Sequence, residues 1–430
     1  MNESNKKRIA DINSGIIPEG YKKTKVGILP VEWKTVRLKT ISKHSTEKNK
    51  DLKYHETYTN SATQGIIKQT DYFDKQISNN ENIDGYYIVR QNDYVYNPRI
   101  SVSAPCGPIS KSHFVETGVM SPLYTVFRLN DEYEDNGYIE HYFKSPFWYR
   151  YMSSVANYGA RHDRMNITND DLFNMPIPIP PLPEQQKIAE ILSTQDKLIE
   201  LQEKKIEQLK ELKKAYLQKM FPKKGSKYPE LRFKGFTDAW EQRKVGELTV
   251  ESSEYTTLEA GFPLLTSSRN GLMYQNEYRG KQTTDSTETM FSIVPLGACT
   301  YRHMSDDDVF HLNVNRLEKG LVSREYPVFY ASDDNNLDFI VQQINSSAEF
   351  RSFCAEQKKG GTRTRLYYKN LCEFQMLIPN TEEQEKIAKF LLTLDSIITL
   401  HQHKPNKKGH DVLTVMPFKG NQRKPHYLCT

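Results

Sequence analysis

One module of about 200 residues occurs twice in this chain of 430 residues, and this duplication constrains the fold more than any other feature. Each copy ends in the pattern Glu-Gln-x-Lys-Ile-Ala, at 184–189 and again at 383–388. Trp33 and Trp240 each open a short segment of alternating apolar residues near the start of a copy. A chain of this length predicts two domains of ordinary size, each with its own core.

Four further pairs of matched segments, which we call stations, keep their order and nearly their spacing between the copies. They are the Ser-x-x-x-Gly frames at 61–65 and 267–271, the segments around Tyr96 and Tyr301, the matched stretches 118–127 and 320–329, and the pair 159–165 and 360–366. Chance would not keep order and spacing together, so we interpret the chain as an internal duplication.

Each copy predicts a β-rich region followed by a helix. Short β-branched and aromatic runs broken by Asn, Asp, Gly and Pro are typical of strands and turns. The prolines between 176 and 183 predict an extended entry to a helix that begins just after them. The apolar stripe of that helix is Ile188, Leu192, Ile199, Ile206, Leu209, Leu212, Tyr216 and Met220.

About 35 helical residues form a rod roughly 50 Å long. We expect the apolar stripe to pack on the equivalent helix of the other copy, which would hold the two β-rich domains at a fixed separation. The alternative is a helix packed on its own domain.

Composition narrows the class of protein only slightly. The net charge of +5 is too small to indicate nucleic-acid binding by itself, and the 26 Tyr and 19 Phe suit either polar interfaces or ordinary β-rich cores. Five cysteines without a Cys-x-x-Cys spacing indicate scattered reduced thiols. The polar N-terminus and the lack of an eighteen-residue apolar run predict a cytoplasmic protein with no membrane association.

Motifs for catalysis are missing from the sequence. There is no phosphate-binding Gly-x-x-x-x-Gly-Lys loop, no Gly-x-Gly-x-x-Gly and no His-Glu-x-x-His, and 97–99 only partly echoes the Asn-Pro-Pro-aromatic loop of adenine methyltransferases. We interpret the acidic runs at 306–308 and 333–334, and His401 with His403, as solvated groups. The sequence therefore predicts a non-enzymatic chain without catalytic, cofactor or metal sites, against the alternative of a stand-alone nuclease or methyltransferase.

The repeated stations carry side chains suited to DNA recognition, because arginine reads guanine, amides read adenine, and basic groups contact phosphates. The two copies share the Gly, Ser and aromatic positions and differ at the polar ones, as two readers of different sequences would. Solvent-facing residues that drift freely are the alternative. The candidate DNA-binding residues are Thr63, Gln64, Tyr96, Asn97, Arg99, Arg161, His162 and Arg164 in the first copy and Ser268, Arg269, Asn270, Tyr301, Arg302, His303, Arg363 and Arg365 in the second.

Residues of about 20 to 404 resemble the specificity subunit of type I restriction–modification systems. The most specific segments are PIPIPPLPEQQKIAEILSTQDKLIELQEKKIEQLKELKKAYLQKMFP and IPNTEEQEKIAKFLLTLDSIITL. The resemblance implies an α+β fold with two β-rich target-recognition domains, each followed by a long helix, and the helices pairing as an antiparallel coiled coil that acts as a ruler. The expected division is a tail at 1–20, a recognition domain at 21–180, a central helix at 181–222, a linker at 223–234, a second recognition domain at 235–379, a shortened helix at 380–404 and a divergent tail at 405–430.

The resemblance also implies the partners of the chain. A specificity subunit binds double-stranded DNA, with each recognition domain reading one half of an interrupted site. It joins two methyltransferase subunits, which use S-adenosylmethionine to methylate adenine, and restriction subunits that use ATP and Mg²⁺. A scaffold that does not bind DNA, or a variant subunit impaired by its C-terminus, are the alternatives.

One departure from the family pattern concerns the second helix. Pro405 falls where Ile206 stands in the first copy, and proline costs about 3 kcal/mol in a helix interior. No apolar stripe resumes in the tail 405–430, so the second helix is predicted to be about half length. We interpret this tail as an altered reading frame or a recombined end, and expect weaker assembly with methyltransferase subunits.

Overall fold

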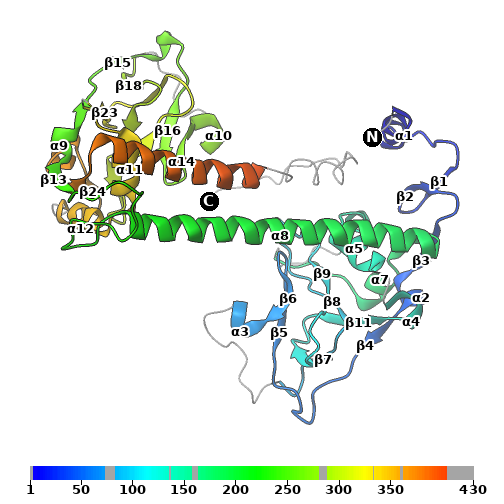
Figure 1. Ribbon diagram of the computed structural model, residues 1–430. Coiled ribbons are helices and arrows are strands. Elements are labelled where there is room, and N and C mark those ends of the chain that lie inside the picture. Colours follow the sequence, from blue (N-terminus) through cyan, green and yellow to red (C-terminus); the bar gives the residue numbers. More distant parts are fainter. Residues whose placement is uncertain are drawn as a thin grey trace. The chain divides into compact units, whose positions relative to one another are not determined.

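Figure 1 shows the computed structural model of the chain, in which residues 3–72, 83–134, 137–156, 163–279, 288–332, 334–358 and 362–403 are described. The described residues form two compact units, which divide between Leu201 and Gln202. Both units contain strands and helices, which confirms the predicted mixed class.

The first unit is built on a four-stranded antiparallel sheet in the order β4-β11-β8-β9. The unit also contains the hairpin of β5 with β6 and the antiparallel pairs of β7 with β10 and β3 with β12. The strands are β1 (Tyr21–Thr24), β2 (Gly27–Pro30), β3 (Lys34–Arg37), β4 (Ser42–Ser45), β5 (Tyr58–Ser61), β6 (Gly65–Lys68), β7 (Tyr87–Val89), β8 (Tyr94–Tyr96), β9 (Ile109–Lys111), β10 (Gly118–Met120), β11 (Thr125–Leu129) and β12 (Pro176–Ile179). The helices are α1 (Glu3–Asn13), α2 (Leu38–Ile41), α3 (Gln69–Tyr72), α4 (Asp131–Glu134), α5 (Tyr138–Lys144), α6 (Tyr149–Val155) and α7 (Asn169–Phe173).

The core of the first unit is largely aromatic. Phe127 on the central strand β11 stacks on Tyr94 and meets Phe143 and Phe173 edge-on, with ring centroids 5.5 to 6.0 Å apart. Trp148 packs against Phe143 and is almost fully buried. Ordinary core packing therefore accounts for part of the high aromatic content.

The second unit repeats this arrangement. Its four-stranded sheet has the order β14-β23-β19-β21, and Phe329 occupies on β23 the place of Phe127 on β11. The strands are β13 (Glu241–Lys244), β14 (Thr249–Glu251), β15 (Tyr255–Thr256), β16 (Leu265–Ser268), β17 (Gly271–Tyr274), β18 (Phe291–Val294), β19 (Cys299–Thr300), β20 (Met304–Ser305), β21 (Asn313–Val314), β22 (Gly320–Ser323), β23 (Val328–Ala331), β24 (Thr364–Arg365) and β25 (Gln375–Ile378). The helices are α9 (Val245–Leu248), the short η2 (Leu258–Ala260), α10 (Gln275–Arg279), α11 (Leu337–Ser346), α12 (Ala348–Glu356), α13 (Tyr368–Leu371) and α14 (Thr381–His403).

The repeated Glu-Gln pattern has the same structural role in both copies. Gln185 donates a hydrogen bond from Nε2 to the carbonyl oxygen of Pro180 at 2.8 Å, and Gln384 donates one to Pro379 at 2.9 Å. The neighbouring glutamates also point inward, because Glu184 accepts the indole N–H of Trp33 and Glu383 accepts two bonds from Arg232. The motif thus stabilises the turn between strand β12 or β25 and the helix that follows it.

Helix α8 (Leu182–Met220) has 39 residues, which corresponds to about 58 Å. In the second unit its C-terminal part contacts α14 at three places, Gln202 with His401, Lys213 with Asp395, and Tyr216 with Phe390. Residues later in α8 contact residues earlier in α14, so the two segments run in opposite directions.

The apolar residues of α8 are unequally covered. Met220 is buried in the core of the second unit together with Ile387 and Leu391 of α14. In contrast, Ile191, Leu198 and Leu201 expose 52 to 62% of their surface. The description of α14 ends at His403, and the divergent tail 405–430, with Pro405 and the hypothesis attached to it, lies outside the described residues.

Candidate nucleic-acid interface

Three of the repeated stations of the first unit meet at one end of its sheet. The β5–β6 turn with Thr63 and Gln64 is tied to the segment after β8, because Asn97 donates from Nδ2 to the carbonyl oxygen of Asn60 at 2.9 Å. Arg99 in turn forms a β-bridge with Arg164. Segments about 35 and 65 residues apart in the sequence are thus brought together.

In the second unit the matching turn is held by β21, the strand that pairs with β19. Asn313 on β21 donates from Nδ2 to Ser267 Oγ at 2.7 Å and to the carbonyl oxygen of Ser268 at 2.9 Å, which holds the β16–β17 turn against the sheet. Strand β20 pairs with β24 through Met304 and Arg365. These two residues stand at the positions of Arg99 and Arg164 in the duplicated sequence, so the bridge itself is repeated.

Two of three consecutive aspartates bind basic side chains of the second unit, and the third accepts a hydrogen bond from a threonine. Arg269 binds Asp307 at 2.5 Å, and Arg363 donates from Nε to Asp306 at 2.7 Å. The Thr364 hydroxyl donates to Asp308. The hydrogen bond from Arg269, the largest effect, holds the pKa of Asp307 below its ordinary value. The acidic run that we interpreted as a solvated turn is therefore exposed but ion-paired, and it orients arginines.

Several candidate DNA-binding residues are buried instead. Tyr96 is 2% exposed and its hydroxyl donates to the carbonyl oxygen of Cys106, and Tyr301 is 0% exposed within the aromatic core. Asn97 is also buried and donates a hydrogen bond to the carbonyl oxygen of Asn60, and His303 is 2% exposed. Their side chains support the loops and present no surface to a base edge, so they leave the contact set that we propose.

The remaining candidates form two surfaces, which we name the first rim and the second rim. The first rim consists of Thr63, Gln64, Arg99 and Arg164, and the second rim consists of Arg269, Asn270, Arg302, Arg363 and Arg365. Ser268 stabilises the turn of the second rim, because its hydroxyl donates to the Gly271 carbonyl oxygen and accepts the Asn270 N–H. Arg161 and His162 lie outside the described residues.

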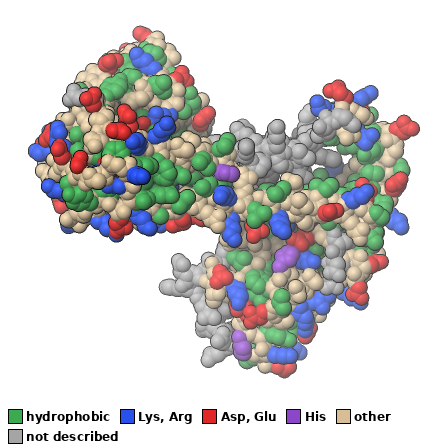
Figure 2. Space-filling model, in the orientation of Figure 1, with side chains coloured by type: hydrophobic (Ala, Val, Ile, Leu, Met, Phe, Trp, Pro, Cys, Tyr) green, Lys and Arg blue, Asp and Glu red, His purple; other side chains and the backbone are tan. Residues whose placement is uncertain are grey.

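Charges of both signs are interspersed on the face of the molecule in Figure 2. No group of three His, Cys, Asp or Glu among the described residues is arranged to hold a metal ion. The described helices also include none that is long and apolar enough to cross a membrane.

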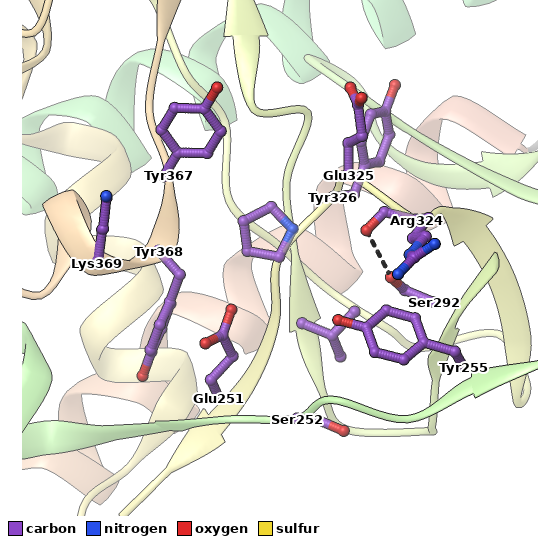
Figure 3. A pocket seen from close by; sticks show the side chains of 12 residues that line it. Glu251, Ser252, Tyr255, Ser292, Arg324, Glu325, Tyr326, Tyr367, Tyr368 and Lys369 are labelled. Carbon is purple, nitrogen blue, oxygen red and sulfur yellow. Dashed lines mark hydrogen bonds between the residues drawn. The ribbon is translucent and has the colours of Figure 1, made fainter. Parts of the chain in front are cut away.

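The second unit also contains a cavity of about 310 Å³ that was not predicted from the sequence. Tyr367 and Tyr368 lie on one side of it, Tyr255 and Arg324 lie on the other, and Glu251 lies between them (Figure 3). The residues that line the cavity come from four separate segments, 251–255, Ser292, 324–328 and 367–369, so only the fold brings them together. The one sequence signal is the Tyr367-Tyr368 pair, which stands where the first copy has Asn166 and Ile167.

Comparisons with known proteins agree with this architecture. The family described as the type I restriction modification DNA specificity domain matches residues 30–211 and 316–407. A putative type I restriction enzyme MjaX specificity subunit of Methanocaldococcus jannaschii is 25% identical over 410 residues, which cover 89% of this chain and 91% of that protein.

Two solved structures have a similar fold. One is the type I restriction–modification S subunit from M. genitalium, with a TM-score of 0.53 and 15% identity, covering 89% of this chain and 93% of that one. The other is a chain from a study of complex assembly and conformational transition of the type I R-M system, with a TM-score of 0.51 and 15% identity, covering 90% of this chain and 97% of that one.

Proposed function

Because this chain belongs to the family of type I restriction modification DNA specificity domains, we propose that its two rims read the two halves of one interrupted DNA site. The observation that carries the proposal is the repeated geometry: the same β-bridge joins two stations in both units and the matched turn is hydrogen-bonded to the sheet region in each, while the exposed polar residues differ. One scaffold with two different sets of donors and acceptors suits a bipartite, asymmetric site.

The rims differ in the bases that they suit. Gln64 can donate and accept in the first rim, as adenine requires, and the second rim is rich in guanidinium groups that match the two acceptors of guanine. The ion pairs of Arg269 and Arg363 hold these side chains in place before DNA arrives, which lowers the entropy lost on binding.

We also propose that α8 and α14 act as a ruler and as a platform for partner subunits. The antiparallel contacts of α14 with α8 support a paired rod, and the exposed Ile191, Leu198 and Leu201 offer an apolar stripe to another protein. The chain itself is non-catalytic in this proposal. Two modification subunits supply methyl transfer to adenine with S-adenosylmethionine, and restriction subunits supply cleavage with ATP and Mg²⁺.

The test is to express the chain with its modification subunits and sequence the methylated bases of the host DNA. We expect one asymmetric motif with two defined halves, a fixed gap and methylated adenine in each half. Arg365→Ala should relax or abolish recognition of one half only, because a lost base contact costs about 1–3 kcal/mol. An uninterrupted motif, or methylation by the chain without modification subunits, contradicts the proposal.

A further inference from the structure

The cavity in the second unit lies beside the second rim. Tyr367 follows β24, only two residues after Arg365, and its ring stacks on that of His303 at 5.8 Å between centroids. Glu325, on the other wall, contacts Nε2 of His303 at 3.3 Å. The cavity therefore adjoins the segment that carries Arg365 of the second rim.

The walls of the cavity combine stacking faces with charged groups of both signs. Tyr255 and Tyr367 are 44% and 46% exposed, so part of each ring is accessible although His303 stacks on Tyr367 and Arg324 lies over Tyr255. The guanidinium group of Arg324 lies 5.4 Å from the centroid of the Tyr255 ring, and Tyr368 is held by a hydrogen bond of 2.9 Å to Thr249. The Glu251 carboxylate lies between the two sides, as Figure 3 shows.

This set of groups matches one nucleotide. Tyrosine rings stack on bases of any type, a carboxylate accepts from an exocyclic amino group, and Arg324 and Lys369 at the cavity suit a phosphate. A volume of about 310 Å³ admits a single base with its sugar. We propose, on the basis of the proposed function, that this cavity receives one unstacked, amino-bearing base of the bound DNA, from the half-site that the second unit reads.

The first unit provides an internal contrast. The strand pairing places His44 where the second unit has Glu251, since His44 pairs with Phe127 and Glu251 pairs with Phe329. Asn166 and Ile167 replace the two tyrosines. The first unit therefore lacks both the carboxylate and the stacking pair, so it offers no matching cavity wall to a second unstacked base.

The test measures how the affinity of the complete complex with its modification subunits depends on base pairing. In each duplex of the series, one base that carries an exocyclic amino group is left unchanged, and the base opposite it is replaced so that the two no longer pair. The affinity of each mismatched duplex is compared with that of the matched duplex. An extruded base costs less to unstack from a mismatch. The modification subunits extrude the adenine that they methylate in each half, so a mismatch at those two adenines should tighten binding in both halves. We expect one further position, within the half-site of the second unit, at which binding becomes about tenfold tighter. A scan without this further position is called flat.

Variants of Tyr367 assign the effect to the cavity. Tyr367→Ala should remove the mismatch preference at this further position and weaken binding to the matched duplex about tenfold, whereas Tyr367→Phe keeps the ring and should keep both. Because Tyr367 is partly exposed and not a core residue, neither change should unfold the chain.

The outcomes separate the two proposals. If the complex protects both half-sites from cleavage in a footprinting experiment but the mismatch scan is flat, the base-binding cavity is overturned and the proposed function stands. If the complex protects no specific sequence, the proposed function is overturned. Equilibrium dialysis with dAMP distinguishes a free nucleotide from DNA. If dAMP binds in a manner abolished by Tyr367→Ala while the mismatch scan is flat, the cavity takes free nucleotides and the inference about DNA is wrong.

Discussion

At the scale of single residues, the repeated motifs preserve buried hydrogen bonds. Gln185 and Gln384 satisfy proline carbonyl oxygens that would otherwise be buried without a partner, and their glutamate neighbours bind Trp33 and Arg232. An unsatisfied buried carbonyl costs more than a surface contact gains, which explains why the pattern recurs where the chain turns into each helix.

Gln185→Ala should lower the free energy of unfolding of the first unit by about 1–3 kcal/mol, because it leaves the Pro180 carbonyl oxygen without this donor. Gln186→Ala is the matched control, since Gln186 is exposed on the same helix and its loss should change stability by less than about 0.5 kcal/mol. Urea denaturation measures both. Equal effects of the two substitutions would show that the buried bond is not the cause.

Buried histidines predict a loss of stability in mild acid. The pKa of His303 lies below its ordinary value, chiefly because the side chain is buried. The positive charges of Arg365 and Arg302 lower it further, and the negative charge of Glu325 opposes them. The unfolded histidine titrates near pH 6.5, so below that pH the unfolded chain binds the extra proton first. The folded chain, in which His303 is neutral, is therefore fully stable above about pH 6.5, and this part of its stability is lost as the pH falls through the pKa of folded His303.

Urea denaturation at pH 7.5 and 5.5 measures the effect. The wild type should lose stability between these values, and His303→Gln should lose less, because one depressed group has been removed. An identical pH dependence in the variant would contradict the role of His303. His401 is near the end of α14 and offers a substitution control, His401→Gln.

At the scale of elements, a repeated glycine lets one strand cross closely over a hairpin. A Cβ on Gly118 would lie 2.4 Å from the Tyr58 ring and 2.7 Å from the Glu56 carbonyl oxygen. On Gly320 it would lie 2.5 Å from Leu265 and 3.0 Å from the Pro263 carbonyl oxygen. The same close approach in both units is the physical reason for the glycine at this station.

Gly118→Ala and Gly320→Ala should each destabilise their own unit by about 1–3 kcal/mol, because backbone and packed side chains must move. Gly85→Ala is the control, since nothing lies within 4 Å of its added Cβ and its backbone is not left-handed. Thermal or urea unfolding measures the change. A neutral effect at Gly118 would mean that the β10 strand shifts freely over the hairpin.

At the scale of the whole molecule, the proposed ruler makes the DNA gap depend on helix length. Four residues inserted into α8 between Ile191 and Leu198 lengthen the rod by about 6 Å, which corresponds to roughly 2 base pairs of DNA. Methylation sequencing should then show the same two half-sites with a longer gap. An unchanged gap with normal methylation would contradict the ruler, and substitution of four exposed residues at the same place controls for disturbance of the helix.

Much of the architecture was predictable because it depends on local patterns. The proline-rich entry and the 3.6-residue apolar stripe predict the long helix, and the duplicated stations predict two similar units. The candidate contact residues were less predictable. Thr63 and Gln64 are exposed at a turn, as a binding residue must be, whereas Tyr96 and Tyr301 share the same polar–aromatic context and are buried. Residue type and repeat position do not reveal which way a tyrosine points.

The sequence by itself determined the duplication, the mixed α+β class, the position of both helices and the family. These features rest on periodicity and order along the chain. Only the tertiary structure decided which polar residues form the rims, that two aspartates bind two arginines, and that four separate segments line a tyrosine-rich cavity. Those features depend on strand pairing between residues far apart in the chain, and each residue's burial is a property of that pairing rather than of its neighbours in sequence.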